Sequence, residues 1–246
     1  KLVVDAHDNE RELDSARQLV KEAARIAASA GINMKKVVRS GVNVITALTY
    51  TMKDFDASEI ILGFHQREGR SASSFDNIVY DLLSRISRQI IIVNCRRAVN
   101  TIRCIHVVVP RDAELEVGFH RWLMHVSRLA RQMDCRIIFY STDAAWALIE
   151  AFCHVHYKTI RLSHETFDDF SLYPELSSTV HADHLLILVA ARADSLSYQT
   201  CFHKIPYNLE NDFPECSYMV IFPDQYGIEH KKSSFNTGFH LDSYSN

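Results

Sequence analysis

The sequence predicts an α/β fold with two tandem doubly wound parallel sheets, of which the first lacks its opening strand and helix. Two observations lead to this prediction. Short apolar segments alternate with amphipathic helical segments along the 246 residues, which is the pattern of parallel sheets with right-handed crossovers. In addition, the apolar pattern of residues 56–93 repeats without a gap at residues 183–220, an offset of 127 positions. A repeat of this kind indicates two related units.

The first half alternates strands with helices. A long first helix is expected because Leu13, Ala16 and Val20 recur at helical spacing and Gly31 follows them. The apolar run 90–93 contains no polar residue, which is typical of a strand covered on both faces. The expected elements are strands at 1–4, 34–38, 59–62 and 90–93 and helices at 9–30, 44–55 and 75–88.

The second half shows the complete pattern of five strands and four helices. Its strands are expected at 104–109, 136–140, 159–162, 184–189 and 218–222, and its helices at 115–131, 144–153, 167–180 and 205–213. Beside this pattern, the first half lacks a central strand and its helix. A sheet without its central strand exposes unpaired backbone, so we expect residues upstream of Lys1, or another segment, to fill that place. The predicted units are 1–97, 98–226 and a polar tail at 227–246.

Composition narrows the class of protein. With 47% hydrophobic residues, a net charge of −3 and no clustered Lys or Arg, the chain is predicted to be globular and not to bind nucleic acid. No apolar run reaches the roughly 18 residues that a membrane helix needs. The six cysteines form no Cys-x-x-Cys pair and lie in or beside apolar runs, which favours a reducing compartment over a disulfide framework.

The order of five strands and four helices resembles that of the universal stress protein family. In that family the loop after strand four reads Gly-x-x-Gly, nine residues, then Gly-Ser or Gly-Thr, and its amides hold phosphates. The resemblance places this degenerate nucleotide loop at Gly63, His65, Gln66 and Asn77 of the first unit. In the second unit, Asp112 matches the aspartate that lies near the adenine in the family.

Both loops depart from the family pattern. The first keeps one glycine, and Asp76 puts a negative charge where a phosphate would lie. The second begins near Ala190, and no glycine occurs between Gly118 and Gly227. We therefore favour a scaffold that serves packing and contact over a working ATP site. No resident cofactor is expected, and an adenine nucleotide remains the alternative ligand.

Degenerate tandem units of this kind resemble the cytosolic C-terminal region of cation:proton antiporters of the second monovalent-cation family. The resemblance is one of architecture and extends to about residue 224. The similar stretches are Ile60-Ile61-Leu62-Gly63-Phe64-His65, Val107-Val108-Val109-Pro110, Gly118-Phe119-His120-Arg121-Trp122-Leu123, Leu196-Ser197-Tyr198 and Lys204-Ile205-Pro206.

That resemblance implies a regulatory, non-catalytic region on the cytoplasmic face of the inner (plasma) membrane. Its partner would be the transmembrane antiporter domain of the same polypeptide, and the assembly a homodimer. Contacts that depend on a ligand or on pH would modulate the exchange of sodium or potassium for protons. Because fifth strands of two units pair in the stress proteins, we also expect 90–93 to pair with 218–222.

The sequence offers little evidence for a metal site or for catalysis. His154 with His156, and His181 with His184, lack a third ligand at a diagnostic spacing, so no metal site is predicted. The 13 histidines suggest the hypothesis that some of them make contacts sensitive to pH. No nucleophile motif is present, so an enzyme acting on nucleotides is disfavoured. A free-standing tandem universal stress protein that binds an adenine nucleotide remains the alternative function.

Overall fold

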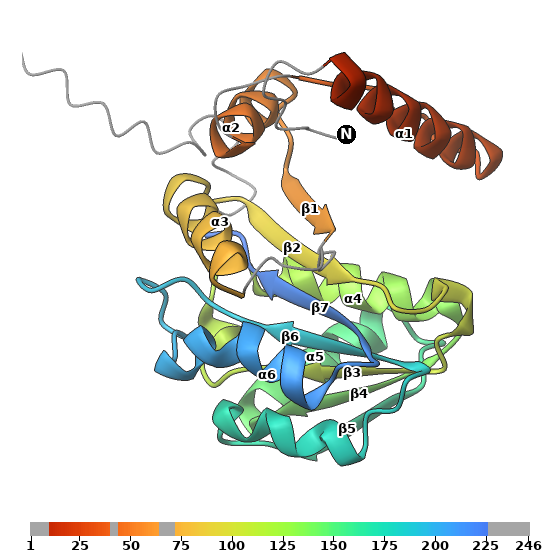
Figure 1. The fold of residues 1–246 in the computed structure, drawn as a ribbon. Coiled ribbons are helices and arrows are strands. Elements are labelled where there is room, and N and C mark those ends of the chain that lie inside the picture. Colours follow the sequence, from red (N-terminus) through yellow and green to blue (C-terminus); the bar gives the residue numbers. More distant parts are fainter. Residues whose placement is uncertain (1–9, 40–43, 64–71, 226–246) are drawn as a thin grey trace, which may run out of the picture. The chain divides into compact units, whose positions relative to one another are not determined.

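The computed structural model describes residues 10–39, 44–63 and 72–225, which divide into two units. The first unit contains helices α1 (Glu10–Ser29) and α2 (Val44–Asp54). The second begins at Ser58 and contains every strand of the described residues (Figure 1). The strand predicted at 1–4 and the tail predicted at 227–246 lie outside the described residues. The unit boundary that the sequence predicts at 97 stays a prediction.

The first unit confirms the two predicted helices. Helix α1 buries Ala16 and Val20 and ends at Gly31, whose φ of 73° is the left-handed conformation that glycine adopts without cost. The strand predicted at 34–38 was wrong, since residues 32–39 form neither helix nor strand. Strand pairing requires a neighbouring strand, and the described part of this unit supplies none.

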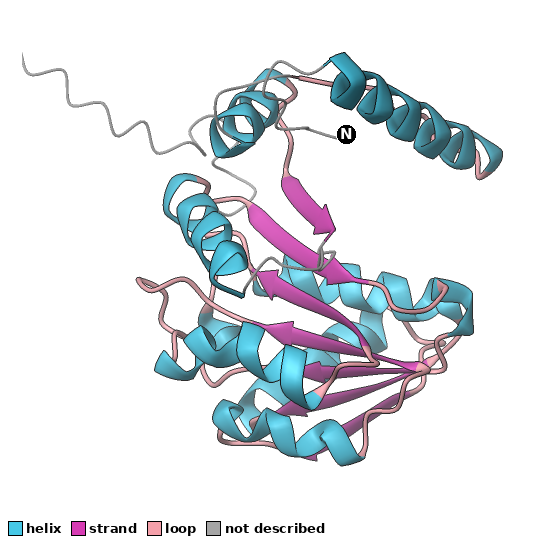
Figure 2. Cartoon of the chain, viewed as in Figure 1, coloured by secondary structure: helices cyan, strands magenta, loops and turns pink. Residues whose placement is uncertain are grey.

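The second unit is built on one seven-stranded sheet in the order β1-β2-β7-β6-β3-β4-β5 (Figure 2). Every neighbouring pair is parallel except β2 with β7. The strands are β1 Glu59–Gly63, β2 Gln89–Asn94, β3 Cys104–Val108, β4 Arg136–Ser141, β5 Leu162–Thr166, β6 His184–Val189 and β7 Ser217–Phe222. The helices are α3 Ala72–Arg85, α4 Phe119–Met133, α5 Asp143–His156 and α6 Ile205–Asp212.

The α/β class is therefore confirmed, and the two expected sheets are joined into one. The predicted pairing of 90–93 with 218–222 is also confirmed: Ile90 pairs with Phe222 and Val93 with Met219, in antiparallel register. We call this β2–β7 junction the seam. Through the seam, the two strands of the first half extend the five-stranded sheet of the second half.

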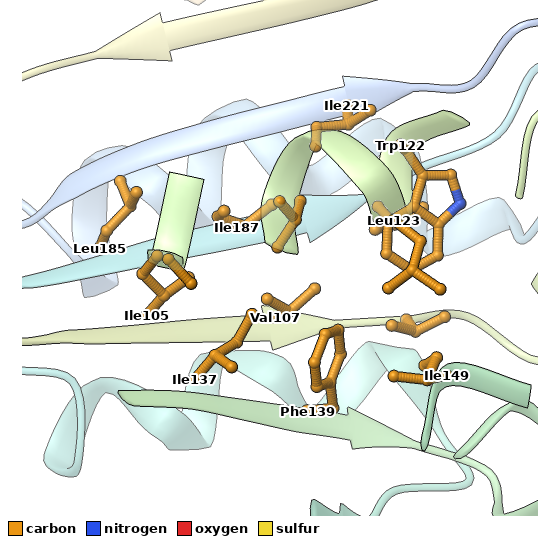
Figure 3. Packing of buried hydrophobic residues seen from close by; sticks show 14 of the residues in the cluster. Ile105, Val107, Trp122, Leu123, Ile137, Phe139, Ile149, Leu185, Ile187 and Ile221 are labelled. Carbon is orange, nitrogen blue, oxygen red and sulfur yellow. The ribbon is translucent and has the colours of Figure 1, made fainter. Parts of the chain in front are cut away.

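Helices cover both faces of this sheet. Helices α4 and α5 lie on one face, and α3 and α6 lie side by side on the other (Figure 1). On the α4 face, Trp122 and Leu123 pack fully buried against strand residues such as Val107 and Ile187 (Figure 3). Burial of one such large side chain contributes about 1.5–3 kcal/mol, so this cluster fixes α4 on the centre of the sheet.

Several predicted elements differ from the structure. Helix α3 begins and ends three residues before the predicted 75–88, and α4 begins four residues after the start of the predicted 115–131. Strand β5 runs from Leu162 to Thr166, not over 159–162, because Lys158 and Thr159 form a turn after α5. The helix predicted at 167–180 is a nine-residue 3₁₀ helix, Phe170–Ser178. It contains Pro174, which has no N–H to donate to the carbonyl four residues earlier and so disfavours an α-helix.

The gapless repeat is also corrected by the strand register. Ile61 of β1 pairs with Ile91, 30 positions later, whereas Leu188 of β6 pairs with Val220, 32 positions later. A repeat at a constant offset of 127 would require equal separations. The two copies therefore differ by two residues between these strands. The offset of 127 also aligns Ile61 with Leu188, whereas the pairing through Ile91 and Ile221 puts Ile61 on the same face as Val189.

Within the described residues, no helix combines the length and the apolar character that a membrane span requires.

Candidate functional site

Ligands of open α/β sheets usually bind outside the carboxyl ends of the strands, where the strand order reverses. In this sheet that point lies between β3 and β6. Asp112 lies there, four residues after β3, with a φ of 64° in the left-handed region. Its side chain helps to line a cavity of about 310 Å³, together with Arg111, Asp168 and Gln199. Asp112 thus lies at the strand ends where open α/β sheets bind ligands, and its contact with an adenine stays a prediction.

The loop after β6 donates its hydrogen bonds to a carboxylate of the same chain. The backbone N–H of Ser197 lies 2.9 Å from Oε1 of Glu116, and the Ser197 hydroxyl lies 3.0 Å from the same oxygen. Ser197 is buried. Loop amides bind phosphate in nucleotide sites, and here one of them, the N–H of Ser197, bonds a carboxylate of the same chain.

The charges around this position also oppose a bound phosphate. Two carboxylates, Asp112 and Asp168, line the cavity against one guanidinium, Arg111, and Glu116 lies on the loop beside it. An anionic ligand would have to overcome this repulsion. The arrangement does not favour nucleotide triphosphates at the second predicted site.

The first predicted loop lies far along the sheet from Asp112. Gly63 ends β1, and β2, β7 and β6 separate β1 from β3. A Cβ added to Gly63 would meet no atom of the described residues within 4 Å. His65 and Gln66 lie outside the described residues, and of Asn77 the structure describes only its position in α3. Gly63 and Asp112, the two predicted site residues whose surroundings the structure describes, therefore lie apart.

A buried arginine that sequence reasoning did not single out ties the two sides of the seam together. The guanidinium of Arg192 donates to the carbonyls of Ile86 (3.0 Å) and Arg88 (2.7 Å) and to that of Pro223. Burial lowers the pKa of Arg192 to about 10. A lone Arg among alanines directly after an apolar strand was the signal in the sequence, since an arginine is buried only with partners.

A ligand-sized cavity lies at the seam, on the face that carries α3 and α6. Its volume is about 330 Å³, and apolar side chains from both halves line it, among them Val79, Leu83, Ile205 and Phe222. Its polar groups are linked, since the Tyr198 hydroxyl lies 2.8 Å from His203 Nε2 and the Tyr80 hydroxyl bonds His203 Nδ1. An apolar cavity with a few converging polar groups is the usual form of a small-molecule site.

The histidines fall into two different situations. His154 and His156 lie exposed in the last turn of α5, and no metal-type cluster in the described part of the chain includes them. His184 does have companions: His106 and Cys104 of β3 lie beside it. These two residues lie about 80 positions from His184 in the sequence and are brought beside it by strand pairing, so no spacing in the sequence signals the group.

Comparison with known proteins gives the fold. Neither a protein-family model nor a curated protein matches the sequence. Among solved structures, a universal stress protein from Archaeoglobus fulgidus DSM 4304 is similar, with a TM-score of 0.56 and 13% identity over 92% of this chain and 82% of that chain. A putative universal stress protein from Pseudomonas aeruginosa UCBPP-PA14 has a TM-score of 0.53 and 12% identity, over 91% and 82% of the two chains.

The cytoplasmic domain of a prokaryotic cation chloride cotransporter is also similar, with a TM-score of 0.53 and 11% identity over 94% of this chain and 84% of that chain. Structural similarity at identities this low shows the fold and not the function. The chain thus has a universal-stress-protein-like fold.

Proposed function

We propose that this chain is a non-catalytic regulatory region of a membrane cation:proton antiporter, joined to the transmembrane domain in the same polypeptide and acting on the cytoplasmic side. One observation carries the proposal. The loop after β6, which the family resemblance leads us to expect as the phosphate loop, donates two hydrogen bonds from Ser197 to the carboxylate of Glu116. The fold is kept while its phosphate site is closed, which favours a role in contact and regulation.

The exposed edge of the sheet at β1 favours a further strand beside it. Within the described residues, strand β1 pairs with β2 alone, and its Ile61 is 64% exposed. Ile61 pairs with Ile91, which belongs to the core cluster under α4, so Ile61 points to the same face as α4. A further strand and helix of the polypeptide would cover this edge and this face, as we expect from the incomplete strand pattern of the predicted unit 1–97.

The seam offers a way to regulate. Helices α3 and α6 come from different halves and both line the 330 Å³ cavity, while Arg192 holds the ends of α3, β2 and β7. A ligand that binds the cavity more tightly in one arrangement of the two halves shifts the population toward that arrangement. The membrane domain would sense that shift through the contacts that it makes with the chain.

The experiment measures cation-dependent proton exchange by the full polypeptide in membrane vesicles, with a variant that fills the cavity, Leu83→Trp. We expect the rate of exchange to depend differently on the pH or the ligand content of the cytosolic side, while the polypeptide still transports. The matched control is Leu148→Trp, at an exposed position of α5 on the other face, which should leave transport unchanged. Unchanged transport by Leu83→Trp, with the cavity filled, would argue against regulation through the seam.

The second candidate, a free-standing tandem universal stress protein that binds an adenine nucleotide, is favoured by the similarity to the stress protein of Archaeoglobus fulgidus DSM 4304. Thermal unfolding with ATP or AMP separates the two candidates. A ligand at 100 times its dissociation constant adds about 2.7 kcal/mol of stability. We expect no such shift at millimolar nucleotide, and a saturable shift would support the second candidate.

A homodimer is part of the proposal as well. Light scattering of the purified chain measures its mass. A mass of one chain at all concentrations would contradict the proposed homodimer.

A further inference from the structure

Three metal-ligating side chains meet at the amino ends of β3 and β6, away from the strand ends that hold Asp112 and from the seam cavity. A ligand atom of Cys104, of His106 and of His184 all lie within 4.8 Å of one another. Cys104 and His106 are buried, and His184 is largely so, with 12% of its side chain exposed.

Strand geometry explains why they meet. Cys104 and His106 are two residues apart on β3, so both side chains point to one face of the sheet. His184 begins β6 and lies directly opposite Cys104 in the parallel register, so its side chain points to that same face. The backbone of two central strands therefore fixes all three residues, which gives a more rigid site than a loop provides.

The two imidazoles face each other through their ring nitrogens. Nε2 of His106 lies 3.0 Å from Nδ1 of His184. The backbone N–H of His181 also donates to that Nδ1, over 3.3 Å. In the metal-free chain, one proton lies between the two rings, and the Tyr140 hydroxyl bonds Nδ1 of His106 at 3.0 Å. Two nitrogens on one tetrahedral zinc ion, each about 2.0–2.1 Å from the metal, are roughly 3.3 Å apart. The two rings therefore need to separate by only a few tenths of an ångström.

We propose that Cys104, His106 and His184 bind one divalent transition-metal ion of the zinc class. The metal takes the place of the proton between the two rings and of the thiol proton of Cys104, and both protons leave to solvent. A Cys-His-His set is typical of zinc and of cobalt, and is too soft for magnesium or calcium. Water, or the exposed His181 whose ring centroid lies 5.0 Å from that of His184, completes the tetrahedron.

Two neighbouring groups suit a metal in this position. Burial raises the pKa of the Cys104 thiol, and Nε of Arg136, which points at Sγ of Cys104 from 3.3 Å, opposes that rise. Oδ1 of Asp183 lies 3.8 Å from Nε2 of His184, on the side of the ring away from the metal position. Carboxylates on the distal nitrogen orient metal-bound histidines in many proteins, and Asp183 is placed for that role.

Cobalt(II) is the probe, because a cobalt–thiolate bond gives a charge-transfer absorption in the near ultraviolet that a histidine-only site lacks. The chain, freed from any affinity tag and titrated with Co²⁺, should gain this band with one equivalent of metal, and Zn²⁺ should remove it. Cys104→Ser should abolish the band, and His184→Gln should weaken Co²⁺ binding by about 10- to 100-fold or more. Circular dichroism of each variant shows that it is folded.

Cys216→Ser is the matched control, since Cys216 is also buried, directly before β7, and lies outside the cluster; its titration should match that of the parent chain. If the parent chain shows no charge-transfer band, or if the band survives Cys104→Ser, the site does not exist as proposed. Loss of Co²⁺ binding by Cys216→Ser while it stays folded would also contradict the assignment.

Discussion

The carboxylate of Glu116 accepts two hydrogen bonds from Ser197, one from its backbone N–H and one from its hydroxyl. The first of these residues follows β3 and the second lies in the loop after β6, so the contact closes the gap between the carboxyl ends of two central strands. A loop that would be free to hold an anion is thereby fixed by an anion of its own chain.

Glu116→Ala should destabilise the chain by about 1–3 kcal/mol, because the buried N–H and hydroxyl of Ser197 lose a charged acceptor. Urea unfolding measures the change in the free energy of unfolding. Glu150→Ala, at an exposed position of α5, is the control and should stay within about 0.5 kcal/mol of the parent chain. Equal stabilities of the two variants would show that the Glu116 contact contributes nothing.

Gly118→Ala should destabilise the chain by about 1–3 kcal/mol through overpacking. A Cβ at this position would lie 2.4 Å from the carbonyl oxygen and 2.7 Å from the nitrogen of Asp224. The φ of Gly118 is −78°, which any residue adopts, so the close approach alone produces the cost. Gly63→Ala is the matched control, since a Cβ there has no neighbour within 4 Å, and its melting temperature should not fall.

Arg192→Leu should weaken the seam by about 3 kcal/mol or more, because the buried carbonyls of Ile86 and Arg88 lose their donor. Hydrogen exchange measures where the loss falls: amides of β2 should exchange faster, and those of β4 should change less. Arg192→Lys should recover only part of the stability, since an ammonium cannot reach several carbonyls at once. Uniform faster exchange throughout the sheet would mean that Arg192 does not act at the seam.

Stability in acid should depend on Glu59, the first residue of β1. A hydrogen bond from His125 lowers the pKa of Glu59, and Gln89 and Arg121 add to the shift. A carboxyl group with a lowered pKa contributes stability above its unfolded pKa, near 4.5, and loses it as the pH falls through the lower folded pKa.

Glu59→Gln should therefore flatten the fall of unfolding free energy between about pH 5 and pH 3. Denaturant titrations at several pH values check this, with Glu150→Gln as the control. An acid limb that is as steep in Glu59→Gln as in the parent chain would refute the role of this pair.

The sequence predicts the elements whose apolar pattern is strong and local. The run 90–93 indicates a covered strand, and its pairing with 218–222 could be expected from the family resemblance. Contacts that depend on strand register could not be predicted, because the sequence alone does not place Cys104 opposite His184. Arg192 likewise shows no partner in the sequence, because all its partners are backbone carbonyls. Pro174 could have signalled the short 3₁₀ helix, since proline inside a helix removes a hydrogen bond.

The most direct test of the proposed attachment to a transporter is the size and location of the native polypeptide. Cells are fractionated, membranes are washed with alkaline carbonate, and an antibody raised against residues 58–225 detects the chain. We expect the antigen to stay in the washed membranes on a polypeptide far larger than the 28.2 kDa of these 246 residues. An antigen of about that mass in the supernatant would contradict the proposal and favour the free-standing stress protein.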